Sequence, residues 1–450
     1  MKKYLISFLV FSLSATTYAT RVAVTDSGTD FGHDWLKGRA LINTADVTGN
    51  RVDDDRNGKV DDVMGWNFVE GYGKIFFPEH LQSVDTNIYR YFEVIGRIQA
   101  EIATREDEKF WQDNIANLKP EEKKVLETKL NFYGQYAHST HVSGIIASLS
   151  PDSKIMSNRV FPDTPPEGTN VTNLKKVGPA DILYKVFAVL SNGTFTQVGN
   201  YLKERQIDVA NYSLGVSLQT IAKLVLGLRG IKDPTPEQLS AETRRASAQF
   251  IPEGVKWMSG SPGTLFVVAA GNDGQDNDLL PTFPANVRVD NSISVAATNG
   301  IEKLAKFSNF GIKTVDIAAP GVSIMSSVPA LDHSQLLPMS GTSMAAPYIA
   351  GIASKAKEIN PKLTATELKK LLMLTVDHKD WLKGKVIAEG VVNPNRVYAA
   401  AEKSKTVTLD EAIKEAQSMV RDQNATLIPV GPKSVKLPTE MLQFANSLVF

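Results

Sequence analysis

Three residues far apart in the chain carry groups that could act together in acyl transfer. Ser343 lies in "SGTSMAAP", His138 lies in "HSTHVSG", and Asp26 follows the short apolar run "VAVT". A serine hydroxyl can attack a carbonyl carbon when an imidazole removes its proton and a carboxylate orients that imidazole. Taken by itself, "SGTSMAAP" is explained equally well by a serine that caps the start of a buried helix.

The residues around Ser343 are small, which lets a large molecule approach the backbone. Gly341 permits a sharp turn at little steric cost, and "MAAPYIAGIASKAKEIN" has helical spacing, so a helix is expected to begin near Ser343. The first turn of a helix offers unpaired N–H groups and the positive end of the dipole to a developing negative charge. Asn272 in "VVAAGNDG" could donate its amide to the same charge, although a Gly-Asn pair after a strand is usually only a turn.

Apolar runs that end in turn residues alternate with helical segments along the chain. The runs after Asp26 are "DVANYSLG", "TLFVVAAGNDG", "SISVAAT" and "TVDIAAPG". This alternation predicts an α/β fold with a doubly wound, mainly parallel sheet flanked by helices. Sites in such sheets form at the carboxyl ends of the strands. We therefore expect Asp26 at a strand end and His138 where a helix begins.

The chain order of the three residues is Asp26, His138, Ser343. The α/β-hydrolases use the order serine, acid, histidine, and their nucleophile has a glycine two residues away on each side. Here Ala345 stands at the second of those glycine positions, and His378 is the one histidine after Ser343. The order excludes the α/β-hydrolase fold.

Five segments resemble the motif blocks of the subtilisin-like serine proteases, the subtilases of the peptidase S8 family. They are "VAVTDSG", "HSTHVSG", "NYSLG", "VVAAGNDG" and "SGTSMAAP", in the family's order, and they span about residues 21–400. The resemblance implies an endopeptidase with a subtilisin-like fold that acts on proteins or peptides. It implies Asp26 as the acid of a triad, His138 as the general base, Ser343 as the nucleophile and Asn272 as the oxyanion donor.

The same resemblance implies where a substrate binds. The backbone of Ser213, Leu214 and Gly215 would pair with an extended peptide, as in strand addition. This segment, with Ala270 and Gly271, would form the walls of the main specificity pocket. His141, the second histidine of "HSTHVSG", is expected to be a structural helix residue.

Three features depart from the family pattern. Ser139 stands where the family usually has glycine, and a small hydroxyl should fit there. Asp273 follows the oxyanion asparagine and would favour polar or basic side chains only if it faces the pocket. Asp26 comes directly after the expected signal peptide, so no room is left for an N-terminal pro-domain. Either the protein folds unassisted, or the helical insertion or the C-terminal appendage takes the place of a pro-domain.

The chain divides into a signal peptide, a catalytic unit and an appendage. "MKKYLISFLVFSLSATTYA" has two lysines, a short apolar run and small residues before a cleavage point after Ala19. Residues 20–400 form the expected catalytic domain, with helical insertions at about 80–135 and 216–258. Residues 401–450 form a C-terminal appendage. Helix starts are predicted by Pro120 and by capping boxes at Thr235–Gln238 and Thr408–Glu411.

The composition limits the kinds of partner. The 450 residues contain 49 Lys and Arg and 49 Asp and Glu, so nothing suggests a nucleic-acid partner. No cysteine is present, which excludes disulfides, thiolate catalysis and cysteine zinc sites. Beyond the signal peptide no segment is apolar enough to span a bilayer. We expect a secreted or periplasmic monomer.

The acidic loop "DDDRNGKVDDV" predicts a structural calcium site. Asp53, Asp55, Asn57 and Asp61 follow the first half of EF-hand spacing, and the chemistry itself would need no cofactor. The twelfth position is Met64, so the loop is not an EF-hand, and Asp62 or a distant carboxylate would have to close the shell. The alternative is a hairpin turn at Asn57-Gly58 with solvated charges.

Two other functions use the same residues. A catalytically inactive subtilase-fold protein could serve as a calcium-stabilised binding or structural module, but a complete set of nucleophile, base and orienting acid argues against it. An esterase or peptide ligase would share the acyl-enzyme and differ only in the acceptor. The sequence therefore favours an exported serine endopeptidase.

Overall fold

The computed structural model describes residues 18–161, 193–423 and 437–450. Most of the expected signal peptide, residues 1–17, lies outside the described residues. From Tyr18 onward the chain enters the fold directly, because Thr20 is buried and β1 (Arg21–Asp26) is an inner strand of the main sheet.

The centre of the described structure is a nine-stranded sheet. In spatial order its strands are β12 (Asp377–His378), β13 (Gly390–Val391), β9 (Ile317–Pro320), β7 (Ser292–Asn299), β5 (Leu265–Ala269), β3 (Val209–Tyr212), β1 and β2 (Lys154–Arg159), with β8 (Lys303–Leu304) paired on β7. The pairs β12–β13 and β7–β8 are antiparallel, and the other pairs are parallel. The predicted mainly parallel α/β sheet is confirmed.

The winding direction of the sheet changes at β1. From β1 the chain moves to β2 on one side, and it then returns to place β3, β5, β7 and β9 successively on the other side. The carboxyl ends of β1 and β3 therefore lie at a topological switch point, where α/β sheets form their sites. Asp26 is the last residue of β1, and Ser213 directly follows β3.

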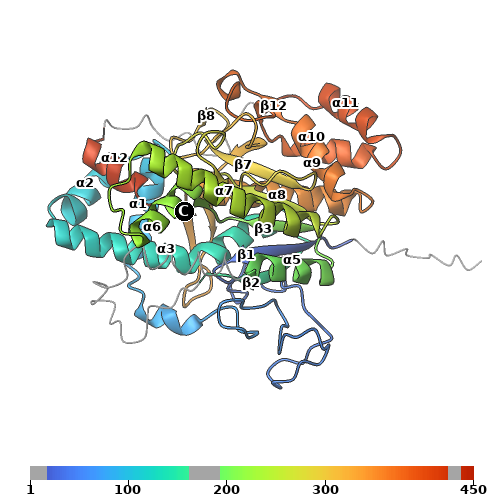
Figure 1. Ribbon diagram of the computed structural model, residues 1–450, viewed down its shortest axis with the longest axis horizontal. Helices are drawn as coiled ribbons and strands as arrows, with labels where there is room; N and C mark the ends of the chain where they lie inside the picture. The colour runs from blue at the N-terminus through green and yellow to red at the C-terminus, as the bar shows by residue number, and fades with distance from the viewer. Residues whose placement is uncertain (1–17, 162–192, 424–436) are drawn as a thin grey trace, which may run out of the picture.

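Helices cover both faces of the sheet (Figure 1). One face carries α3 (Pro120–Leu149), α8 (Thr342–Ile359), α9 (Ala365–Leu374), α10 (Pro394–Lys403) and α11 (Leu409–Met419). The other face carries α5 (Thr194–Glu204), α6 (Leu218–Leu228) and α7 (Pro236–Ser259). Three short elements lie outside these layers. The strand β4 (Val216–Ser217) pairs antiparallel with β6 (Thr282–Phe283), and the 3-10 helix η4 (Asp380–Leu382) follows β12.

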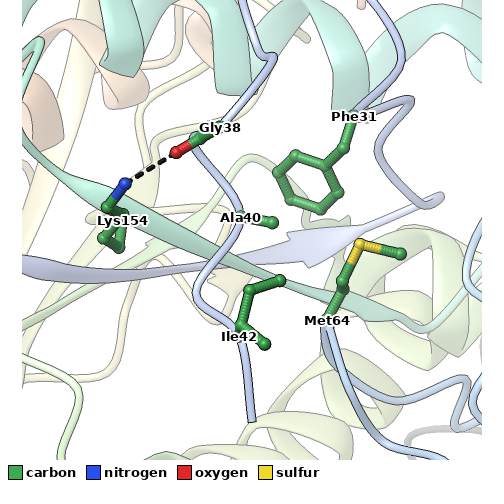
Figure 2. Close-up of a pocket in the computed structure, with 6 residues that line it drawn as sticks. All are labelled: Phe31, Gly38, Ala40, Ile42, Met64 and Lys154. Atoms are coloured by element: carbon green, nitrogen blue, oxygen red, sulfur yellow. Dashed lines mark hydrogen bonds between the residues drawn. The ribbon is translucent and has the colours of Figure 1, made fainter. Parts of the chain in front are cut away.

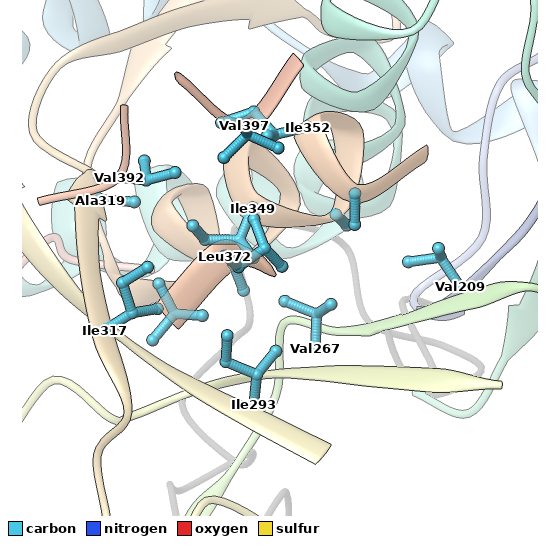
Figure 3. Packing of buried hydrophobic residues seen from close by; sticks show 14 of the residues in the cluster. Val209, Val267, Ile293, Ile317, Ala319, Ile349, Ile352, Leu372, Val392 and Val397 are labelled. Carbon is cyan, nitrogen blue, oxygen red and sulfur yellow. The ribbon is translucent and has the colours of Figure 1, made fainter. Parts of the chain in front are cut away.

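Alternating side chains explain why the sheet is covered on both faces. In β5, Val267 packs toward α8 and α9, whereas Phe266 and Val268 pack toward α5 and α7. This is the period of two that a pleated strand imposes. Figure 3 shows the first layer, where strand residues such as Val267 and Ile293 meet Ile349 of α8 and Leu372 of α9.

The inserted region before "HSTHVSG" is continuous with the helix that carries His138. We expected a helix to begin at His138, but α3 starts at Pro120 and passes through His138 without a break. The reason is composition: residues 121–137 are mostly good helix formers and contain no proline, so the helix propagates into the motif. His138 therefore sits in mid-helix.

A separate buried cluster, the satellite core, contains no residue from the strands of the main sheet. It joins the first half of α3 to four short elements: η1 (Pro78–Ser83), α1 (Ile88–Gln99), α2 (Arg105–Trp111) and the π-helical turn η2 (Gln112–Ala116). The antiparallel hairpin of β10 (Ile324–Ser327) and β11 (Leu336–Met339) also packs against this cluster. The helix α12 (Thr439–Asn446) closes it.

The C-terminal residues pack in two places. The boundary we expected at residue 400 falls inside α10, and α11 packs on α9 and α10 as part of the main core. By contrast, α12 lies far from α11, beside α1 and α2, although more than 300 residues separate them in the chain (Figure 1).

The helix starts predicted from Pro120 and from the two capping boxes are confirmed. Pro120 is the first residue of α3, and Thr235 and Thr408 cap α7 and α11 through reciprocal bonds with Gln238 and Glu411. These local signals are reliable because capping uses only groups within one turn. Among the described residues, none of the helices combines the length and the apolar character that a bilayer crossing demands.

Candidate active site

Asp26 and His138 meet at the carboxyl end of β1. The Asp26 side chain is 1% exposed, and its two oxygens lie 2.9 and 2.8 Å from Nδ1 of His138. The backbone N–H of Ser27 donates a further bond of 2.6 Å to Oδ1. The backbone of the following residue thus holds the Asp26 carboxylate in place. The carboxylate points at the imidazole of His138 in α3, which is 112 residues away in the chain.

This contact determines the tautomer of His138. A carboxylate only accepts hydrogen bonds, so Nδ1 must carry the proton and donate it to Asp26. In the neutral ring Nε2 then has the free lone pair, which is the form that can take a proton from a hydroxyl. Among the described residues, Nε2 has no other hydrogen-bond partner that would block this use.

Ser343 is the second residue of α8 and is 5% exposed. Its Oγ donates to the carbonyl oxygen of Ser213 at 3.1 Å, and the Ser213 Oγ donates back to the Ser343 carbonyl at 2.7 Å. The hydroxyl therefore rests on the β3 loop and does not hydrogen-bond to His138. Catalytic hydrogen bonds are often absent from the free form of an enzyme and form when substrate binds.

Asn272 is held in one orientation by Thr342, the residue before Ser343. Its Oδ1 accepts bonds from the Thr342 N–H at 2.8 Å and from the Thr342 hydroxyl at 2.9 Å. Because a backbone N–H must face an acceptor, these contacts identify the amide oxygen and leave the NH2 group on the other side. The amide and the N–H of Ser343, unpaired in the first helical turn, can donate to one oxygen atom.

The two expected pocket walls lie on either side of Thr282. Gly215 is exposed and faces Thr282 and Phe283, while Ala270 is fully buried and Gly271 has a φ of 111°, in the left-handed region. A Cβ on Gly271 would overlap the side-chain amide of Asn309. Only glycine fits there, because the chain must turn tightly against a buried side chain.

Thr282 narrows the space between these walls. Its methyl group lies 3.4 Å from the positions that a Cβ would take on both Gly215 and Gly271. Its hydroxyl donates to Asn277 Oδ1 at 3.1 Å, which fixes the rotamer. A substrate side chain that enters between the walls therefore meets a rigid, branched residue.

The Ser213–Gly215 segment leaves backbone available for pairing. Ser213 and Leu214 are buried and Leu214 packs into the core, so their side chains do not form an open surface. Beyond them, β4 pairs with β6. An extended peptide could add along this segment through main-chain hydrogen bonds.

The neighbouring histidine and serine have structural contacts. The Nε2 of His141 lies 2.9 and 3.0 Å from the carbonyl oxygens of Ile324 and Leu337, which ties α3 to the β10–β11 hairpin. Burial lowers the pKa of His141 to about 3, so it is neutral at ordinary pH. Ser139 is buried, and its hydroxyl lies 2.9 Å from that of Thr29, so the extra Cβ is accommodated.

The acidic loop brings together a set of carboxylates that differs from the expected one. Oxygens of Asp46, Asp53 and Asp55 lie within 4.8 Å of one another. Asn57 turns its amide nitrogen toward carboxylates, at 3.2 Å from Asp55 Oδ2, because its own oxygen accepts from the Lys59 N–H. Asp61 has a φ of 60°, its Oδ1 accepts a hydrogen bond from the Gly49 N–H at 2.8 Å, and it is not a member of this set.

Asp62 lies at the buried side of the acidic loop. Burial raises the pKa of Asp62, although hydrogen bonds from Tyr201 and Asn57 oppose that effect. Met64, at the position where an EF-hand would have its last ligand, instead lines a shallow surface hollow with Phe31 and Ile42 (Figure 2). The oxygen-only set of Asp46, Asp53 and Asp55 could hold a hard divalent cation.

Sequence reasoning missed three residues that the structure places at these sites. They are Thr342, which orients Asn272, Thr282, which lies between the expected pocket walls, and Asp46, which joins the acidic set. Thr342 lies inside "SGTSMAAP", so its place beside Ser343 was visible, but its contact with Asn272, in the turn after β5 and 70 residues away, was not. Asp46 and Thr282 carry no pattern that could have indicated their roles.

Comparisons with known proteins show the family of this chain. The family model described as the subtilase family matches residues 18–407. "Subtilisin Savinase" of Lederbergia lenta is 28% identical over 243 residues, which cover 53% of this chain and 69% of that protein. The "Extracellular basic protease" of Dichelobacter nodosus is 37% identical over 144 residues, 30% of this chain and 23% of its own length. The latter match spans less than a quarter of the relative.

The solved structures that match this chain have lower sequence identity. A cold adapted subtilisin-like serine proteinase is 19% identical, with a TM-score of 0.40, over 82% of this chain and 89% of its own. The A-subunit of the AB5 toxin from E. coli is 20% identical, with a TM-score of 0.45, over 89% and 93% respectively.

Proposed function

The chain belongs to the subtilase family of serine peptidases, and we propose that it is an exported endopeptidase that cleaves protein substrates. The observation that carries the proposal is the buried Asp26 carboxylate on Nδ1 of His138, at the carboxyl end of β1. A protein that only binds a partner does not need a buried carboxylate aimed at a histidine whose other nitrogen is free.

In the proposed reaction Ser343 rotates its hydroxyl from Ser213 toward His138. Nε2 of His138 removes the proton while Oγ bonds to the scissile carbonyl carbon, and Asp26 stabilises the imidazolium that forms. The carbonyl oxygen gains negative charge, which the Asn272 amide and the Ser343 N–H stabilise. His138 then protonates the leaving amine, and water hydrolyses the acyl-enzyme by the same steps in reverse.

The acyl part of the substrate would bind along Ser213–Gly215, with one side chain between the two pocket walls. Thr282 leaves little depth there, so we infer a preference for a small side chain such as alanine before the scissile bond. Asp273 is exposed, and its backbone N–H is held by Asn309 at 2.9 Å. Its carboxylate gives no basis for a preference for basic side chains.

The experiment that tests this function is the intact mass of the protein after treatment with a fluorophosphonate. A single adduct that disappears in Ser343→Ala supports the assembled triad, because the reagent requires an activated serine. The opposite result is folded, calcium-loaded protein that forms no adduct, both with the C-terminal segment 437–450 in place and after that segment is displaced. It would favour the inactive binding module instead.

Export is supported by the first 19 residues and by the name of one relative. The lysines and apolar run of residues 1–19 have the pattern of a signal peptide, and the similar Dichelobacter nodosus protein is called extracellular. N-terminal sequencing of protein recovered from a producing cell's medium or periplasm tests the proposed cleavage after Ala19.

Asn272→Ala should lower kcat for peptide hydrolysis by about 100- to 1,000-fold with little change in KM, since an oxyanion donor acts mainly in the transition state. Steady-state kinetics on a peptide with alanine before the scissile bond measures this. Thr342→Val removes the hydroxyl that holds Asn272 and keeps the N–H bond, so its loss should be smaller. If Asn272→Ala and Thr342→Val raise KM equally and neither lowers kcat, the proposed role of Asn272 is contradicted.

We also propose that Asp46, Asp53 and Asp55 bind a stabilising Ca²⁺. Three clustered carboxylates repel one another, and an oxygen-only set suits this ion. Calcium at 100 times its Kd should add about 2.7 kcal/mol to the free energy of unfolding. Thermal unfolding in calcium and in EDTA should therefore differ by several degrees.

Asp46→Asn should remove most of that difference. Asp34→Asn is the matched control, because Asp34 is an exposed loop carboxylate that pairs with Lys37 outside the set. An unfolding temperature that is the same in calcium and in EDTA would argue against the site.

A further inference from the structure

The described segment 437–450 is fastened to the satellite core by α12. The Gln99 side chain of α1 donates to the carbonyl oxygens of Ala445 and Leu448, at 2.7 and 3.1 Å. Phe444 packs edge-on against Trp111 of α2, with ring centroids 5.2 Å apart. Figure 1 shows α12 in red beside the cyan helices α1 and α2. These contacts hold the residues that follow α12 in one place.

That place is the backbone directly before the nucleophile. The N–H of Phe450 donates to the carbonyl oxygen of Ser340 at 2.8 Å. A Cβ on Gly341 would overlap the carbonyl of Phe450. We expected Gly341 to make a sharp turn, but its backbone is extended, with φ 161° and ψ 163°. Glycine is needed at this position because another main chain passes so close.

The ring of Phe450 lies on the helix that carries the base. A Cβ on Gly134 would overlap the Phe450 ring, and the ring of Phe92 is stacked 6.0 Å away. Gly134 precedes His138 by four residues, so both lie on the same face of α3, one turn apart. Phe450 therefore touches both the helix of His138 and the loop of Ser343.

The proposed reaction assigns a role to this side of the site. His138 must give its proton to the leaving amine, so the leaving part of the substrate has to lie beside His138 and Ser343. Ser213–Gly215, which would hold the acyl part, contact Ser343, Thr282 and Phe283 instead. The contacts of Phe450 are those of a peptide residue: its N–H bonds a carbonyl and its ring fills an apolar recess.

We propose that Phe450 occupies a subsite for a large apolar residue that follows the scissile bond, and that segment 437–450 blocks this subsite in the free protein. The inference rests on the proposed function. Gly134, Phe92 and the Ser340 carbonyl form the subsite, and the ligand class is an extended peptide with an aromatic or large aliphatic side chain. Because α12 carries most of the segment's contacts, Val449 and Phe450 can leave without unpacking the helix.

The test compares Phe450→Ala with the full-length wild type on two substrates that share an acyl part ending in alanine. One is a peptidyl methyl ester, which has no residue after the scissile bond. The other is an internally quenched peptide that continues for several residues and includes phenylalanine. The variant should raise kcat/KM for the long peptide at least tenfold, mainly through KM, and leave ester hydrolysis unchanged.

Leu442→Ala is the matched control, because Leu442 is a partly buried residue of α12 that packs on the satellite core. It should not raise the rate on either substrate. If Phe450→Ala leaves the rates on both substrates unchanged, or lowers both, Phe450 is only a packing residue and the inference is wrong.

A second readout separates this inference from the proposed function. Fluorophosphonate labelling and ester hydrolysis report the triad in the same preparations. In the Ser343→Ala background, the anisotropy of the fluorescently labelled long peptide measures binding without catalysis. Adding Phe450→Ala should tighten binding at least tenfold, and more for phenylalanine than for glycine after the scissile position. Unchanged binding would overturn the subsite even if the enzyme is active.

Discussion

Replacing Ser343 by alanine should lower kcat for peptide hydrolysis about a millionfold, the loss found in subtilisin when the nucleophile or base is removed. Without Oγ no acyl-enzyme forms, and the remaining donors stabilise only direct attack by water. The fold should persist, because the lost bond is a single hydroxyl contact with the Ser213 carbonyl and the Ser213 hydroxyl still bonds the backbone of residue 343. Kinetics and thermal unfolding on the same samples measure both effects.

The control for this variant is Ser354→Ala. Ser354 is buried on the same helix, and its hydroxyl donates to the Ala350 carbonyl at 2.8 Å, so the change removes a similar group away from the site. It should keep wild-type kcat. A Ser343→Ala protein that still hydrolyses peptides at the wild-type rate would refute the assignment of the nucleophile.

Asp26→Asn should lower kcat by about 10,000-fold, the size of the effect when a triad acid becomes an amide. The amide can donate to Nδ1 of His138, which favours the tautomer with a proton on Nε2. That tautomer cannot accept the Ser343 proton, so the geometry survives while the base is lost. The effect should fall on kcat more than on KM, because the substrate does not touch Asp26.

Asp30→Asn is the matched control for that change. Asp30 is a buried aspartate in the same loop, and it accepts the Gly32 N–H at 2.9 Å rather than a bond from His138. It should leave the pH dependence of kcat unaltered. Comparable losses in the two variants would mean that Asp26 acts by holding the loop, not by orienting His138.

Much of the scaffold could be predicted from local patterns. The continuous apolar run in "TLFVVAAG" predicts a strand, and its residues Val267 and Phe266 pack into separate cores on the two faces of the sheet. Capping at Thr235 and Thr408 was predicted because the cap and its partner lie within four residues. Such features depend on backbone geometry and near neighbours, which a short window of sequence contains.

Contacts between distant segments could not be predicted in this way. The acidic loop was expected to use Asn57 and Asp61, but the backbone turns them to other partners and brings in Asp46. The start of a helix at His138 was wrong, because the sequence before it also forms helix and α3 simply continues. Ligand spacing in a loop does not specify which oxygens converge, since each φ and ψ redirects the next side chain.

The sequence by itself determined the chemical groups, their order along the chain and the parallel sheet that carries them, because residue type and periodicity are properties of short segments. Only the tertiary structure decided that Asp26 meets His138, that Thr342 turns the amide of Asn272, and that Phe450 reaches the backbone before Ser343. Each of these contacts joins residues at least 70 positions apart. Their geometry follows from how the helices pack on the sheet, and no local pattern encodes that packing.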